Sequence, residues 1–154
     1  CEGWDVRTLV AHVVTGEALV AQVLGGGSSW DADVDPSVLG LNPVAAWRGT
    51  ALAALDAASG DGVLDAIHPH AAGDLPGGVI VGFRVTDNLV HGWDLARACG
   101  TDVELPDGLA DLCLDFWLPL AGSDGMAAHF DAPVMPPEGA SPGVRLLSFL
   151  GRTP

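Results

Sequence analysis

The stretch Asp87-Asn88-Leu89-Val90-His91-Gly92-Trp93-Asp94 places a carboxylate and an imidazole four residues apart in an apolar part of the chain. Apolar residues recur around it at helical spacing, so the sequence predicts a helix over about residues 79–98. Because residues at i and i+4 lie on one helical face, Asp87 and His91 can both reach one metal ion. An exposed helix-surface pair, contributing about 0.3–0.5 kcal/mol, is the simpler alternative, since this spacing arises by chance in many helices.

A third ligand is offered by His12, which lies in another strongly apolar run that predicts a helix over residues 5–24. Its neighbours on the same face are Thr8, Thr15 and Gly16, and such small side chains leave room for a ligand. Two imidazoles and one carboxylate suit Zn²⁺ or a similar borderline ion and leave a coordination position open. Taken alone, His12 is also explained as a core histidine whose ring is satisfied by a neighbouring carbonyl.

Further ionisable groups lie on the face that carries Asp87 and His91. Arg84 can receive an anionic group of a substrate, or it can form a salt bridge to Asp87 or Asp94, and the sequence leaves both interpretations open. A histidine that binds a metal usually donates its second N–H to a carboxylate or carbonyl, and Asp94 and Asp5 are the candidates for that role.

Composition excludes several functions. The 154 residues carry a formal net charge of −14, which repels polyanions and argues against nucleic-acid binding. The six basic residues are all Arg, and the absence of Lys and Tyr excludes a Schiff-base lysine and a phenolic acid or base. The three cysteines, Cys1, Cys99 and Cys113, form no C-x-x-C pair and are expected to be free thiols. No apolar run approaches the ~20 residues that span a bilayer, so we expect a cytoplasmic protein without a membrane partner.

The chain is expected to be mainly all-α, with a short strand or hairpin segment and a long irregular insertion near the C-terminus. The predicted helices cover residues 5–24, 43–59, 79–98, 106–121 and 142–150; the strand covers 63–68 and the insertion 122–141. His68-Pro69-His70 can present two imidazoles to a metal, although an exposed loop explains it as well. His129 falls in the insertion and is expected to be exposed.

Two motifs of the chain resemble a known group of proteins. Cys1-Glu2-Gly3-Trp4-Asp5-Val6-Arg7-x2-Val10-x-His12 and Asp87-x2-Val90-His91-Gly92-Trp93-Asp94-Leu95-Ala96 resemble actinobacterial proteins related to the N-terminal domain of mycothiol-dependent maleylpyruvate isomerase. That group belongs to the DinB/YfiT-like superfamily of metal-binding four-helix bundles. The resemblance extends to residues 130–134 and 145–152 and so covers most of the chain.

The resemblance implies one domain over residues 1–154, a DinB-like four-helix bundle in which His12, Asp87 and His91 hold a divalent ion, usually zinc or nickel. It suggests mycothiol as a co-substrate, and hence a metal-dependent enzyme that activates a low-molecular-weight thiol for transfer or isomerisation of a small-molecule substrate. A non-catalytic metal- or ligand-binding module and a polar bundle core without metal are the alternatives. Superfamily members carry a further helix before the Trp4-Asp5 motif, and a bundle without it would expose an apolar face, which predicts a homodimer or an unstable protein.

Overall fold

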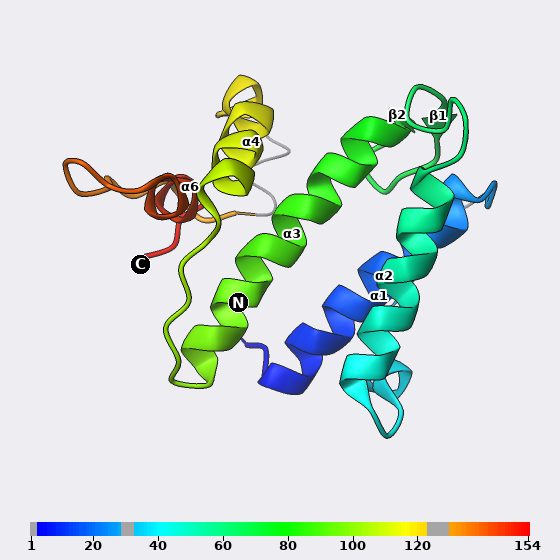
Figure 1. Cartoon of the computed structure of the whole chain (residues 1–154), viewed down its shortest axis with the longest axis horizontal. Coiled ribbons are helices and arrows are strands. Elements are labelled where there is room, and N and C mark those ends of the chain that lie inside the picture. The colour runs from blue at the N-terminus through cyan, green and yellow to red at the C-terminus, as the bar shows by residue number, and fades with distance from the viewer. Residues whose placement is uncertain (1–2, 29–32, 123–129) are drawn as a thin grey trace. The chain divides into compact units, whose positions relative to one another are not determined.

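A computed structural model of the chain describes residues 3–28, 33–122 and 130–154, and the chain divides into two compact units, residues 1–98 and 99–154. The first unit contains α1 (Val6–Leu24), the 3-10 helix η1 (Pro36–Leu39), α2 (Pro43–Ala58), β1 (Ile67–His68), β2 (Leu75–Pro76) and α3 (Gly77–Ala98) (Figure 1). The second contains α4 (Asp107–Trp117), the 3-10 helix η2 (Leu118–Leu120) and α6 (Pro142–Phe149). The predicted mainly helical class is confirmed. A single domain over residues 1–154 stays a prediction.

The first two helices begin where the sequence predicts, because each has a capping side chain. The Asp5 carboxylate accepts a hydrogen bond from the Thr8 amide at 2.7 Å and caps α1. At α2, the Asn42 side chain accepts from the Ala45 amide at 3.0 Å, and Pro43 occupies the first turn, where a missing N–H costs nothing. The two helices therefore start within one residue of positions 5 and 43, where the sequence predicts them.

The segment before α3 differs from the prediction of a strand over residues 63–68. Residues 61–66 form hydrogen-bonded turns, and only Ile67–His68 pairs with Leu75–Pro76 as a short antiparallel hairpin. The turns use backbone donors that a strand would need, since the Val63 amide donates to Gly60 and the Ala66 amide to Gly62. The chain then enters α3 two residues earlier than the predicted start at 79.

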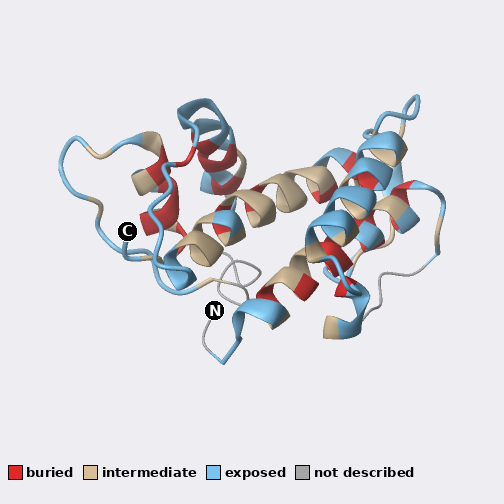
Figure 2. Cartoon of the chain, turned by 60° about the horizontal axis from the view of Figure 1, so that its bottom comes forward, coloured by how far each residue is buried: buried red, intermediate tan, exposed pale blue. Residues whose placement is uncertain are grey.

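Helix α1 packs against both α2 and α3 and supplies most of the core of the first unit. One buried cluster joins all three helices and consists of Val20, Val23, Leu24, Ala54 and Ile80. By contrast, α2 has a single buried residue and leaves apolar side chains in water, among them Val44, Leu52 and Leu55. Figure 2 shows this contrast between the buried positions of α1 and the exposed face of α2. The homodimer expected from the sequence stays a prediction.

The sequence-based expectation that no apolar run is long enough to span a bilayer is wrong for α1. Among the described residues, α1 alone is long and apolar enough by length and composition, with 19 residues and a mean hydropathy of 1.2. Helices that form the core of a folded domain meet the same criteria, and half of this apolar window is buried inside the structure.

In the second unit, α4 and α6 pack against each other through buried faces that include Cys113 and Leu146. The predicted helix over 106–121 is shorter than expected: α4 ends at Trp117 and a 3-10 turn follows, because Pro119 cannot donate to a helical hydrogen bond. The described part of the predicted insertion, residues 130–141, is irregular. His129 lies outside the described residues.

Candidate metal centre

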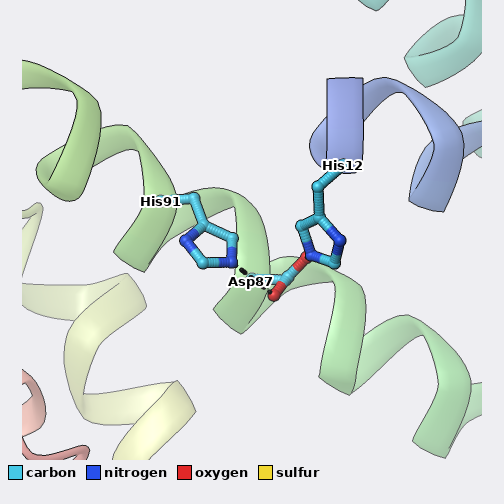
Figure 3. Close-up of side chains that lie close together, drawn as sticks. All are labelled: His12, Asp87 and His91. Carbon is cyan, nitrogen blue, oxygen red and sulfur yellow. Dashed lines mark hydrogen bonds and ion pairs between the residues drawn. The ribbon is translucent and has the colours of Figure 1, made fainter. Parts of the chain in front are cut away.

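His12 from α1 meets Asp87 and His91 from α3 (Figure 3), and one ligand atom of each residue lies within 4.8 Å of the others. His12 Nε2 is 3.1 Å from Asp87 Oδ2, and His91 Nε2 is 3.2 Å from Asp87 Oδ1. The two imidazole rings are perpendicular, with centroids 5.1 Å apart. Two ring nitrogens and one carboxylate therefore lie close enough together to be shared by one divalent ion.

Helical geometry on α3 and the packing of α1 together explain this convergence. Asp87 and His91 are one helical turn apart and lie on the same face, while α1 packs against α3 and brings His12 to it. The side chains of His12 and Asp87 are 30% and 28% exposed, whereas that of His91 is 11% exposed. His91 is therefore the least exposed member of the cluster, and His12 and Asp87 are more open to solvent.

The orientation of His91 is fixed by a second carboxylate. His91 Nδ1 lies 3.0 Å from Asp94 Oδ2, so Nδ1–H donates to Asp94 and Nε2 is directed at the cluster. Asp94 is thus one of the two carboxylates that the sequence suggested for this task. The other, Asp5, caps α1 instead.

The electrostatics of the cluster favour a cation at its centre. Burial by itself raises the pKa of Asp87, but hydrogen bonds from His12 and His91 and the charge of Arg84 outweigh it and hold that pKa well below its usual range. Burial likewise lowers the pKa of His91, but hydrogen bonds to Asp87 and Asp94 outweigh it and raise that pKa. Asp87 is therefore ionised, and His91 keeps its proton to a higher pH than a free imidazole does.

Arg84 forms the ion pair that the sequence left as one of two interpretations. Its Nη2 donates to Asp87 Oδ2, and its Nε lies 3.3 Å from Glu17 Oε1. The guanidinium is thus held between two carboxylates, and its side chain is only 11% exposed. Binding of an anionic substrate group by Arg84 stays a prediction.

Two residues of the site were missed by reasoning from the sequence. Glu17 is 5% exposed and is the only acidic residue within α1, which is a signal that could have found it. Trp4 is 41% exposed, and its ring centroid lies 4.9 Å from that of His12. Trp4 therefore forms part of the rim of the cluster.

A small cavity of about 200 Å³ lies beside the cluster, between the start of α1 and the end of α3. Its wall includes Trp4, which contacts His12, and Asp94, which holds His91. A larger cavity of about 370 Å³, between α1, η1 and α2, does not include any of the three clustered residues.

The two histidines of the His68-Pro69-His70 motif are engaged separately. His68 Nε2 lies 2.9 Å from the carbonyl oxygen of Val63, and the ring of His70 packs against Phe83 with centroids 5.5 Å apart. These contacts fit the loop interpretation of this motif.

The fold and the site define a helical protein in which two histidines and one aspartate from two helices gather in a half-buried cluster. Residues 1–96 match the family model of the mycothiol maleylpyruvate isomerase N-terminal domain, and the chain belongs to this family. The matched region ends close to Ala98, where the first compact unit ends.

Two relatives from Mycobacterium tuberculosis resemble nearly the whole chain. They are the uncharacterized proteins MT0763 of strain CDC 1551 / Oshkosh and Rv0738 of strain ATCC 25618 / H37Rv. Each is 32% identical over 156 residues, which cover 99% of this chain and 82% of the relative. No solved structure matches the chain.

Proposed function

We propose that the chain binds one divalent ion through His12, Asp87 and His91. The observation that carries this proposal is the convergence of three ligand atoms, from two helices, within 4.8 Å of one another. Two imidazole nitrogens and one carboxylate oxygen suit Zn²⁺ best and Ni²⁺ second, because these ions prefer nitrogen-rich ligand sets. The Asp94 carboxylate supports the site further, since it holds the His91 ring with Nε2 toward the cluster.

The proposed function is that of a metal-dependent enzyme that activates a low-molecular-weight thiol, as a mycothiol-type transferase or isomerase. Membership of a family described by mycothiol maleylpyruvate isomerase supports this reaction class. A bound divalent ion would lower the pKa of the thiol and would stabilise the negative charge that develops during the reaction. The chain contributes the orientation of the ligands, and the exposed edges of His12 and Asp87 give a small thiol access to them.

Elemental analysis of protein purified without a metal-affinity tag tests the metal. We expect near-stoichiometric zinc or nickel in the wild type and its loss in His91→Ala and Asp87→Asn, because each substitution removes a ligand. His70→Ala is the matched control, since it removes a histidine that packs against Phe83 outside the cluster. A wild type that holds no metal and takes up none on titration would contradict the proposal.

A spectroscopic titration separates the enzyme from a metal-binding module without thiol chemistry. The Co²⁺-substituted protein is titrated with N-acetylcysteine, and we expect a sulfur-to-cobalt charge-transfer band because the site keeps an open coordination position. N-acetylserine, which differs only in oxygen for sulfur, is the control and should produce no such band. A coordinatively closed site would give no band with either compound, and the non-catalytic alternative would then hold.

A further inference from the structure

A partly buried polar network extends from the cluster and joins the three helices of the first unit. Glu17 of α1 accepts from Asn88 of α3 and pairs with Arg84 of α3. Asn88 also donates to the Arg84 carbonyl at 2.9 Å and accepts from the Trp47 indole of α2 at 3.5 Å. Arg84 in turn pairs with Asp87, so the network ends on the carboxylate of the candidate metal centre.

Gly16 provides the space that the guanidinium of Arg84 occupies. A Cβ atom at this position would lie 1.8 Å from Arg84 Nη1 and 2.7 Å from Cζ, distances that no side chain tolerates without displacement. The neighbouring position is Glu17, whose side chain is 6% exposed. Residues 16 and 17 of α1 thus supply the room and the counter-charge that this one guanidinium needs.

We propose that Glu17 and Arg84 are positioning residues of the metal centre, an inference that rests on the proposed function. Arg84 holds Asp87 through Oδ2, which orients the carboxylate and leaves Oδ1 on the side of His91. Glu17 holds Arg84 in place and offsets its positive charge, so that a divalent ion at the cluster meets a neutral pair rather than an uncompensated cation. The network therefore acts on metal affinity and coordination geometry through the orientation of Asp87.

Two substitutions test the network in different ways. Glu17→Gln removes the counter-charge and keeps the shape, and exposed Asp56→Asn on α2 is the control for the same change in net charge. Gly16→Ala changes no charge and displaces the guanidinium, and Gly49→Ala on α2, where a Cβ atom meets nothing within 4 Å, is the matched glycine control. The readouts are the Zn²⁺ dissociation constant from competition with a chelator, the d–d spectrum of the Co²⁺-substituted protein and far-UV circular dichroism.

We expect Glu17→Gln and Gly16→Ala to bind Zn²⁺ about 10- to 100-fold more weakly and to change the Co²⁺ spectrum, as loss of a carboxylate-orienting partner does at other metal sites. Asp56→Asn and Gly49→Ala should leave both readouts unchanged, because their side chains lie outside the network. If Glu17→Gln does not fold, Gly16→Ala still decides the question, because it displaces the guanidinium without removing any charged group.

The positioning role would be overturned if Gly16→Ala, and Glu17→Gln where it folds, kept the wild-type Zn²⁺ affinity and an unchanged Co²⁺ spectrum. The proposed metal centre would still stand in that case, provided that Asp87→Asn loses the metal. A wild type that binds no Zn²⁺ would overturn the proposed function and this inference with it.

Discussion

At the scale of single residues, Asp87 is the centre of the site because three side chains contact its carboxylate. His12 and Arg84 contact Oδ2, and His91 contacts Oδ1. These contacts outweigh the cost of burying the charge and lower the pKa of Asp87. Asp87 therefore stays ionised over the whole physiological range. The pKa of His91 is shifted the other way, so His91 keeps its proton to a higher pH than a free imidazole does.

We predict that metal affinity rises with pH. The pKa of His91 is raised in the metal-free protein by Asp87 and Asp94, and a metal ligand must be unprotonated, so binding releases the His91 proton. Below this pKa the apparent affinity should fall as the pH falls, because the ion must displace the proton from His91. Calorimetric titrations with Zn²⁺ in buffers of different ionisation enthalpy measure both the affinity and the released proton. An affinity independent of pH through this range would show that His91 does not bind the ion.

The sequence identified part of this residue-level picture and missed another part for a physical reason. The Asp87/His91 pair is readable because a helix places i and i+4 on one face. Glu17 could not be assigned a partner, because Arg84 and Asn88 are on another helix and meet it only through the packing of α1 against α3.

At the scale of elements, caps are predictable and the start of α3 is not. Asp5 and Asn42-Pro43 mark their helices locally, through side-chain contacts within three residues. Helix α3 begins at Gly77, where the chain passes close to the turns at residues 61–66 and the Gly77 amide donates to the Ala66 carbonyl. Local helix propensity cannot predict a contact between these two segments. A Cβ atom at Gly77 would lie 2.3 Å from the Val63 carbonyl oxygen.

We predict that Gly77→Ala destabilises the protein and that Gly78→Ala does not. The first substitution forces the new Cβ atom against the backbone of Val63 and should lower the free energy of unfolding by about 1–3 kcal/mol, the range found for overpacked sites. At Gly78 the nearest atom is 3.4 Å from the added Cβ, an ordinary contact. Urea unfolding followed by circular dichroism gives both free energies of unfolding. Equal stability of the two variants would mean that the close approach at Gly77 is relaxed without cost.

At the scale of the whole molecule, the candidate metal centre lies entirely within one of two compact units. The three clustered residues and the polar partners described for them, Glu17, Arg84 and Asp94, fall within residues 1–98. The family match over residues 1–96 covers the same region. Metal binding is therefore a property we assign to the first unit.

We predict that a fragment of residues 1–98 binds Zn²⁺ with the stoichiometry of the full chain. All ligands and the residues that orient them are retained, so the affinity should change little. The measurement is a calorimetric Zn²⁺ titration of both proteins, with Asp87→Asn in the fragment as the control for nonspecific binding. A folded fragment that binds no Zn²⁺ would show that residues 99–154 contribute to the site.

The sequence by itself determined the helical class, the caps of α1 and α2 and the pairing of Asp87 with His91, because each depends on contacts within one helical turn or on apolar periodicity. The tertiary structure alone decided that His12 lies against that pair and that Arg84 is held between Glu17 and Asp87. The contacts that His12 and Glu17 make with α3 join residues 67 or more positions apart, and only the packing of α1 on α3 brings these residues within hydrogen-bond distance.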